Sequence, residues 1–390
     1  MIRARVVTWP APPNGDADGI YGVRVTGLSA ESAQEMVRVA HALGLWVRWH
    51  EGDPILQGPG SLFAGLTGGV SGPAGGAAAE AAAAALARFR QPPRFLEVRG
   101  RTLDLQRPLI VGILNATPDS FYDRGRYFDL AAALARADEM VAEGADLIEV
   151  GGETARPGPA VDPEEEIRRV VPLIEVLADR LPVPVSVDTH KAEVARRAVQ
   201  AGAVMINDIS GLADIRMAEV AAETGAALIV MHIQGRPKVR QVDPQYRAVV
   251  NEVYAFLHDR TEQAQAAGVP RSRLVVDPGF SFGKAVDHDM EVLRRLGEFR
   301  SLGYPIYLAT SRKNYIRDLL GLPFDELLEG TAAAVAYGLA QGAQLVRTHD
   351  VRFMARLARM THAILTPGHG ISEAEARRRS AAEVKARGEG

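Results

Sequence analysis

The chain has 390 residues, of which 47% are hydrophobic and 24% are charged, and its formal net charge is −3. This balance gives no indication of a polyanion-binding surface, and no segment reaches the about 18 consecutive apolar residues that a membrane-spanning helix requires. The absence of cysteine excludes disulfides, thiolate nucleophiles and cysteine-bound metals, so any metal must be held by oxygen atoms or histidine nitrogen.

Residues 1–100 are expected to form a small N-terminal extension of unknown role. Residues 30–45 have the apolar spacing of a helix, and the alanine-rich residues 77–89 are strong helix formers. Between them, residues 58–76 are rich in glycine, serine and proline and are predicted to be a loop or linker. We expect the extension to stabilise the main domain or its oligomer by packing.

A repeating pattern occupies residues 108–349: eight short apolar runs each end at a polar or glycine-rich cluster, and a helical stretch follows almost every run. Strands that alternate with helices indicate a parallel sheet, and eight such units are typical of a (β/α)8 TIM barrel of about 250 residues. We therefore predict an α/β fold with a barrel at residues 101–368 and a charged tail at 369–390. The strands should end near Asn115, Gly151, Asp188, Asn207, Met231, Asp277, Ser311 and His349.

The last two strand ends carry three side chains that can bind an anion: Lys313, Arg347 and His349. In this fold the active site lies at the C-terminal ends of the strands, and the loops after strands seven and eight often bind phosphate. The chain contains only five lysines, so a lysine in such a loop is suggestive of a role for the compact ammonium group. We favour an anion-binding site over surface ion pairing.

The middle strand ends carry Asp188, Asn207 and Asp277, each after an apolar run that should be buried. A buried carboxylate needs partners, and an aspartate can accept from two neighbouring N–H groups. We therefore predict a pocket for a flat, polar, nitrogen-rich ring, although capping of nearby loops is the alternative. Asp208, next to Asn207, is expected to have such a structural role.

The first two clusters lie on long loops, at residues 118–126 and 153–161, which are candidates for lids that exclude water. Asp119 could stabilise a developing cation, and Arg156 could hold an anionic substrate. Asn115 offers an amide oxygen, a ligand that Mg²⁺ accepts. Each of these signals is weak when taken singly.

At this point the chain resembles the dihydropteroate synthase family over residues 101–368. The resemblance rests on eight motifs in order: Gly112-Ile113-Leu114-Asn115-Ala116-Thr117-Pro118-Asp119-Ser120-Phe121, Gly151-Gly152-Glu153-Thr154-Ala155-Arg156-Pro157-Gly158, Ser186-Val187-Asp188-Thr189, Asn207-Asp208-Ile209, Met231-His232, Asp277-Pro278-Gly279, Ser311-Arg312-Lys313 and Arg347-Thr348-His349-Asp350-Val351. Together these matches are far more specific than any one of them.

The resemblance implies a transferase of folate biosynthesis. Such an enzyme condenses 6-hydroxymethyl-7,8-dihydropterin pyrophosphate with 4-aminobenzoate to give 7,8-dihydropteroate and pyrophosphate. The pterin would be bound by Asp188, Asn207, Met231, Asp277 and Lys313. The pyrophosphate would be bound by Asn115, Arg347 and His349, with Asn115 also a ligand of a Mg²⁺ cofactor.

The resemblance also implies an aminobenzoate site and a set of catalytic groups. Around the aminobenzoate and its lids would lie Thr117, Ser120, Phe121, Thr154, Arg156, Pro157, Phe282 and Ser311. The catalytic residues would be Asp119, Lys313, Arg347 and His349. In the family, Asp119 would stabilise the pterin-methylene cation that forms when pyrophosphate departs.

The chain departs from the family pattern at Ala155, Ser281, Ala309 and Thr348. These differences concern the aminobenzoate side and the loops, so two alternatives stay open. One is a pterin-binding paralogue, or a methyltransferase-type pterin-binding barrel, with an altered second substrate. The other is a non-catalytic pterin-binding protein. We further expect a cytoplasmic homodimer that acts on small molecules, without nucleic-acid or membrane partners.

Overall fold

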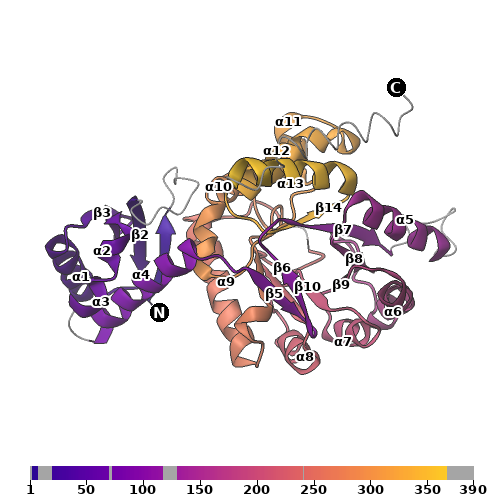
Figure 1. Ribbon diagram of the computed structural model, residues 1–390, viewed down its shortest axis with the longest axis horizontal. Coiled ribbons are helices and arrows are strands. Elements are labelled where there is room, and N and C mark those ends of the chain that lie inside the picture. Colours follow the sequence, from indigo (N-terminus) through magenta and orange to yellow (C-terminus); the bar gives the residue numbers. More distant parts are fainter. Residues whose placement is uncertain (1, 8–19, 70–72, 117–129, 240, 367–390) are drawn as a thin grey trace, which may run out of the picture.

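The computed structural model describes residues 2–7, 20–69, 73–116, 130–239 and 241–366, which form a small N-terminal domain beside a barrel (Figure 1). Within these ranges, no helix is both long enough and apolar enough to cross a membrane. The two parts have separate hydrophobic cores.

Eight parallel strands form the barrel, as the repeating pattern predicts. They are β7 (Leu109–Asn115), β8 (Leu147–Gly151), β9 (Val185–Asp188), β10 (Met205–Asp208), β11 (Ala227–Met231), β12 (Leu274–Asp277), β13 (Tyr307–Leu308) and β14 (Leu345–Thr348). Their order is β12-β11-β10-β9-β8-β7-β14-β13. A parallel bridge between Val276 and Ile306 links the two ends of this series, so the TIM-barrel prediction is confirmed.

Helices pack around the outside of the strands (Figure 1). They are α5 (Leu130–Glu143), α6 (Pro163–Arg180), α7 (Ala192–Gln200), α8 (Arg216–Thr224), α9 (Val249–Ala266), α10 (Val286–Arg294), α11 (Asn314–Leu320), α12 (Leu328–Ala340) and α13 (Val351–Leu365), with 3₁₀ turns η1 (Arg271–Arg273), η2 (Leu296–Leu302) and η3 (Phe324–Glu326). The start of α6 shows why its sequence forms a helix. Asp162 accepts from the backbone N–H of Glu164 at 2.9 Å, and Pro163 occupies the first turn, where its missing N–H is not needed.

The register of the strands brings distant residues into one row across the barrel. Asn115 pairs with Gly151, Gly151 pairs with Asp188, and Asp188 pairs with Asn207. Further round the barrel, Met231 pairs with Asp277. Parallel pairing therefore places four polar or small residues from four strands side by side at the C-terminal end of the barrel.

A two-stranded hairpin closes the opposite end of the barrel. Its strands are β5 (Phe95–Val98) and β6 (Arg101–Asp104), so the predicted boundary at residue 100 falls inside it. Leu96 and Val98 are fully buried in the same cluster as residues of the barrel interior. A substrate therefore has to approach from the C-terminal end, where the polar row lies.

The N-terminal domain is a four-stranded antiparallel sheet with packed helices. Its elements are β1 (Arg3–Val7), β2 (Ile20–Thr26), α1 (Ala30–Ala42), β3 (Trp46–His50), β4 (Asp53–Pro59), α2 (Gly60–Phe63), α3 (Leu66–Gly69) and α4 (Pro73–Arg90), with strand order β1-β2-β4-β3. The two helices predicted at 30–45 and 77–89 are present. The prediction of a loop at 58–76 is wrong, because two short helices and the first turn of α4 form there.

The alanine-rich sequence of α4 has a structural use. Ala78, Ala82 and Ala85 are spaced at helical intervals and are fully or almost fully buried against the sheet, in a cluster with Val23 and Val25. Side chains of one methyl group let the helix lie close to the strands, and their low entropy cost favours the helix. A segment of repetitive composition thus forms part of the core of the small domain.

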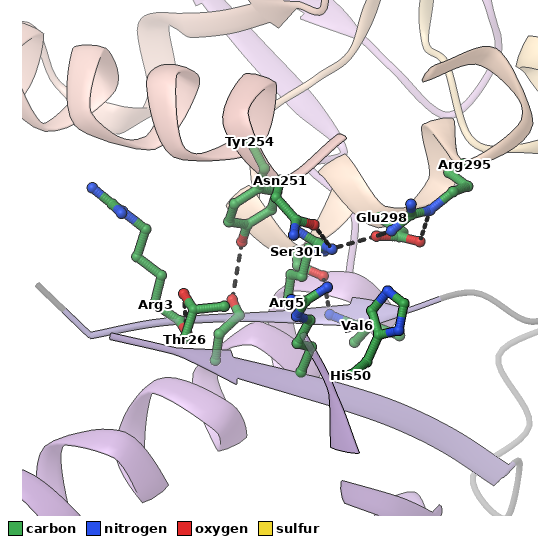
Figure 2. Close-up of polar contacts among 12 residues, drawn as sticks. Arg3, Arg5, Val6, Thr26, His50, Asn251, Tyr254, Arg295, Glu298 and Ser301 are labelled. Carbon is green, nitrogen blue, oxygen red and sulfur yellow. Dashed lines mark hydrogen bonds and ion pairs between the residues drawn. The ribbon is translucent and has the colours of Figure 1, made fainter. Parts of the chain in front are cut away.

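The junction between the small domain and the barrel is polar (Figure 2). Arg5 forms an ion pair of 2.7 Å with Glu298, and the two side chains are only 4% and 1% exposed. The backbone N–H of Val6 donates to the hydroxyl of Ser301 at 2.8 Å. The hydroxyl of Tyr254 donates to the backbone carbonyl of Ala4 at 3.0 Å, so β1 is anchored to both α9 and η2.

Replacing Glu298 by Gln should destabilise the chain, because it leaves the guanidinium of Arg5 buried without its counter-charge. Breaking a buried ion pair costs about 3 kcal/mol or more, whereas exposed pairs contribute little. Urea unfolding measures the change. As a control, Glu193→Gln removes the exposed pair with Arg197 and should have almost no effect. Equal stability of the two variants would show that the buried ion pair contributes nothing to the stability of the fold.

Candidate active site

Two aspartates at the mouth of the barrel have strongly perturbed ionisation. Burial raises the pKa of Asp188 to about 7, against the opposing effect of Arg347, and burial raises the pKa of Asp277 to about 6. Asp277 keeps one satisfied oxygen, which accepts from the N–H of Gly279 at 2.7 Å. Buried carboxylates with raised pKa values in a concave site are typical of ligand-binding and catalytic positions.

Arg347 lies between two carboxylates. Its Nη2 atom is 2.7 Å from Oδ2 of Asp188, and its Nε–H donates to Oε1 of Glu149. Burial opposes its charge, but Glu149 and Asp188 together raise the pKa of Arg347. The structure therefore joins the predicted anion-binding arginine to the predicted ring-binding aspartate in one network.

Lys313 occupies the N-cap position of α11 and faces the same mouth. Burial lowers its pKa to about 8, helped by the charge of Arg347 and opposed by Asp277. Its Nζ atom lies 4.4 Å from the centroid of the Phe282 ring, which gives a cation–π contact. The ammonium group is thus held in place by an aromatic face rather than by a single carboxylate.

His349 is directed by Ser311. The Ser311 hydroxyl oxygen accepts from the backbone N–H of His349 at 3.2 Å and lies 3.0 Å from its Nδ1 atom. The Ser311 hydroxyl proton can then be donated to Nδ1 of His349. The proton of the neutral ring is in that case on Nε2, where it can be donated to a ligand. Burial and Arg347 lower the pKa of His349 to about 4, so near neutral pH it is an uncharged donor.

Asn207 contacts a residue that the sequence analysis missed, Glu149 of β8. The Nδ2 atom of Asn207 lies 3.3 Å from both carboxylate oxygens of Glu149, while its own Oδ1 is buried and has no protein partner. The hydroxyl of Tyr307 also donates to Glu149, at 2.8 Å. Glu149 is the single charged residue in the apolar run 147–150, and that is the signal that could have revealed it.

Asp208 has the structural role expected of it. Its carboxylate accepts from the N–H and the hydroxyl of Ser210 at 2.8 and 2.6 Å, and from the N–H of Leu212 at 2.8 Å. These bonds hold the turn after β10. The neighbouring Asn207 is therefore left as the residue of this pair that is available to a ligand.

The loop after β8 is tied to the loop after β11. The Lys238 ammonium donates to the Thr154 carbonyl at 2.9 Å, and the N–H of Gly158 donates to the Lys238 carbonyl at 3.0 Å. Thr154, Arg156 and Pro157 are all exposed. The guanidinium of Arg156 lies over the ring of Phe324 at 6.0 Å, so these three residues are near the rim and not in the buried network.

The loop after β12 is held by a second buried network. The Lys284 ammonium is 2.8 Å from Nδ1 of His232 and donates to the Gly279 carbonyl at 2.7 Å. Ser281 has a φ of 65°, a conformation that normally favours glycine, and its N–H donates to both oxygens of Asp289 at 3.0 Å. The departure from the family pattern at this position is therefore compatible with the loop.

Met231 provides the apolar side of the mouth. It is buried in a small cluster with Ile209 and Ile233, and Phe282 packs against this cluster. A flat ring that makes polar contacts at its edge needs apolar contacts on its faces, and this cluster is an apolar surface available for them. Four predicted site residues lie outside the residues that the structure describes: Thr117, Asp119, Ser120 and Phe121.

The residues present suit Mg²⁺ only if most of its ligands come from elsewhere. Two side-chain oxygens, Oδ1 of Asn115 and Oδ2 of Asp188, flank the space beside Gly151. Each lies within 4.0 Å of the point that a Cβ atom of residue 151 would occupy. Among the described residues, no group of three or more His, Asp or Glu side chains could hold a metal. A site with few protein ligands, all of them oxygens, fits Mg²⁺, because this ion usually retains water ligands and binds phosphate oxygens.

Residues 111–349 match the sequence model of a family described as pterin binding enzymes. The chain is also 42% identical over 272 residues to the dihydropteroate synthase of Escherichia coli K12, a match that covers 70% of this chain and 96% of that protein. The chain belongs to the dihydropteroate synthase family. Its N-terminal domain lies outside the family match.

A solved structure agrees with this assignment. The dihydropteroate synthase of Thermus thermophilus in complex with 4-aminobenzoate superposes with a TM-score of 0.62 and 42% identity, covering 70% of this chain and 98% of that chain. Another relative, described as inactive dihydropteroate synthase 2 of Mycobacterium leprae, is 44% identical over 271 residues, covering 68% of this chain and 93% of that protein. Overall identity therefore does not separate active from inactive members, and the site geometry has to carry the argument.

Replacing Asp277 by Asn should raise the thermal stability at pH 8. The pKa of Asp277 is about 6 in the folded chain against 3.8 ordinarily, so its ionisation destabilises the fold as the pH rises from about 4 to about 6. The gain is about 3 kcal/mol above pH 7, at about 1.4 kcal/mol for each pKa unit, and should vanish near pH 4. Thermal unfolding at the two pH values checks this. A variant that is less stable at pH 8 would show that Asp277 is well compensated in the fold.

Proposed function

We propose that this chain is an active dihydropteroate synthase that joins the pterin methylene carbon to the amino nitrogen of 4-aminobenzoate with release of pyrophosphate. The proposal rests on one observation, which is that two sets of polar side chains lie next to each other at the mouth of the barrel. Hydrogen-bond acceptors for a nitrogen-rich ring, Asp188, Asn207 and Asp277, adjoin donors for an anion, Lys313, Arg347 and His349. A protein that only bound pterin would not need the second set.

The acceptor groups bind the pterin ring. Asp277 and Asp188 take N–H groups of the ring edge, and the unpaired Oδ1 of Asn207 takes another. The apolar cluster around Met231 covers one ring face. Ring binding therefore satisfies buried polar atoms that are costly to leave unpaired, which gives affinity as well as orientation.

The donor groups stabilise the leaving pyrophosphate. The C–O bond to the pterin methylene breaks with its electron pair passing to the pyrophosphate oxygen. The aminobenzoate nitrogen donates its lone pair to the methylene carbon and later loses a proton. Arg347 and the Nε2–H of His349 meet the developing negative charge in a buried site, where such contacts accelerate reactions strongly. Asp119 is proposed to stabilise the cationic methylene, and the rim residues Arg156 and Pro157 to receive the aminobenzoate.

Mg²⁺ fits this scheme as a companion of the pyrophosphate. Asn115 would contribute its amide oxygen, and the remaining ligands would be phosphate oxygens and water. When bound, the ion would neutralise charge on the leaving group. All binding, orientation and hydrogen-bond donation described above comes from side chains of the chain itself.

We further propose that the chain acts as a cytoplasmic homodimer. On α13, Phe353, Met360 and Ile364 form an exposed apolar stripe at helical spacing, and Met360 and Ile364 are 64% and 69% exposed. On α12, which packs against α13, Tyr337 is also exposed, and its hydroxyl donates to the Arg294 carbonyl. A second copy of the chain is the proposed occupant of this face. The absence of nucleic-acid and membrane partners stays a prediction from composition.

The test of the proposed function is pyrophosphate release by purified protein supplied with dihydropterin pyrophosphate and Mg²⁺, with and without 4-aminobenzoate. We expect release that depends on aminobenzoate, with dihydropteroate formed in equal amount. Lys313→Arg should lower kcat/KM by about 10-fold or more, because a wide planar fork replaces a compact charge. Pterin binding without turnover in the wild type would instead place the chain with inactive relatives.

The dimer has its own test. Met360→Glu places a charge in the apolar stripe and should convert a dimer to a monomer in sedimentation equilibrium, since an unpaired charge is costly to bury. Replacing the exposed Glu219 of α8 by Lys, which changes charge on a helix away from this face, is the control and should leave the mass unchanged. A wild-type chain that sediments as a monomer would contradict the proposal.

A further inference from the structure

Glu149 has no substrate role in the proposed function, yet it contacts three elements of the site. It lies on β8 and is 1% exposed. Its carboxylate receives Nδ2 of Asn207 from β10, the hydroxyl of Tyr307 from β13 and Nε of Arg347 from β14. Burying a carboxylate at this depth is expensive, and all three partners are donors that compensate it.

The contact with Asn207 determines which end of its amide a ligand meets. An ionised carboxylate can only accept hydrogen bonds, so the NH₂ end of the amide must face Glu149. The Oδ1 atom is then the free end, and it is buried without a protein partner. A buried unpaired acceptor is rare in folded proteins unless a ligand or water completes it.

Burial and the surrounding charge keep Tyr307 in the role of a donor. Burial raises the pKa of the Tyr307 phenol, and the charge of Glu149 raises it further, so the hydroxyl stays protonated. The carboxylate of Glu149 therefore has a second fixed donor, the Tyr307 hydroxyl, which comes from β13. This strand is not a neighbour of β10 in the barrel. Its position does not depend on the ligand being bound.

We propose that Glu149 is a positioning residue for the pterin: it holds the amide of Asn207 with the nitrogen turned inward, so that the oxygen is presented to a ring N–H. This inference rests on the proposed function for the identity of the ring. It predicts that Glu149 affects pterin binding through Asn207 and leaves binding of the second substrate unchanged.

The experiment uses the full chain and three variants: Glu149→Gln, Asn207→Asp, and the double exchange that carries both changes. A glutamine at position 149 can donate a hydrogen bond, so it allows the amide of Asn207 to reverse. An aspartate at position 207 places a second carboxylate against Glu149. In the double exchange, a carboxamide again meets a carboxylate, with the donor and acceptor positions swapped, and an acceptor is again presented to the ring.

Calorimetry gives the dissociation constant, without aminobenzoate, for 6-hydroxymethyl-7,8-dihydropterin, which lacks the pyrophosphate that Arg347 is proposed to bind. Each single variant should weaken binding by about 10-fold or more, the loss expected when a hydrogen bond to a buried group is misdirected. The double exchange should bind more tightly than Asn207→Asp alone. In steady-state assays, the KM for 4-aminobenzoate should change less than about twofold in Glu149→Gln, since the proposed role concerns the pterin amide contact alone.

Glu298→Gln is the matched control, because Glu298 is equally buried and paired with arginine but lies at the domain junction. It should lower the melting temperature without changing pterin affinity. Two results would overturn the positioning role. One is a double exchange whose loss of pterin affinity equals the product of the two single losses. The other is a Glu149→Gln variant in which pterin binding and the KM for 4-aminobenzoate worsen by the same factor. Pterin binding by a wild-type chain that makes no dihydropteroate would sink the proposed synthase activity while the binding comparison still decides the role of Glu149.

Discussion

The burial of one positive charge between two negative ones organises the mouth of this barrel. Arg347 joins Glu149, which fixes Asn207, to Asp188, which faces the ring site. If Arg347 were absent, two carboxylates would share a buried volume without compensation, a costly arrangement. Burial lowers the pKa values of Lys313 and His349, and the same guanidinium lowers both further, so a single residue acts on both halves of the site.

The register of the parallel strands supplies the geometry in which that charge acts. Because Asn115, Gly151, Asp188 and Asn207 are consecutive partners across β7 to β10, their side chains need no loop to bring them together. Gly151 has a particular part in this row. Any side chain there would lie against Asn115 and Asp188, so the glycine keeps the space between them open. Rigid strands thus hold the binding groups, while the exposed loops carry the rim.

The sequence predicts the barrel and most of the polar mouth because strand ends leave a strong local pattern. Apolar runs that stop at Asp188, Asn207 or Asp277 are visible without any knowledge of the fold. Glu149 and Tyr307 were not found, because they lie inside strands and their importance comes from contacts between distant parts of the chain. The two residues are 158 positions apart, and the other partners of Glu149 are 58 and 198 positions away. The pairing of Arg347 with Asp188 could not be predicted either, because it depends on how far the arginine side chain extends across the barrel. The sheet of the N-terminal domain was missed because its strands do not alternate regularly with helices, and because the pairing of β2 with β4 skips over α1 and β3.

The way the N-terminal domain is attached has a consequence for the organisation of the chain. The domain keeps its own apolar core, and the barrel residues that it touches include Asn251, Glu298 and Ser301, which water solvates readily. A barrel without the domain would present an ordinary polar surface there, and neither core would need repacking. The domain can therefore be regarded as a module fused to the side of a self-sufficient barrel, whose polar row at the C-terminal ends of the strands does not depend on it.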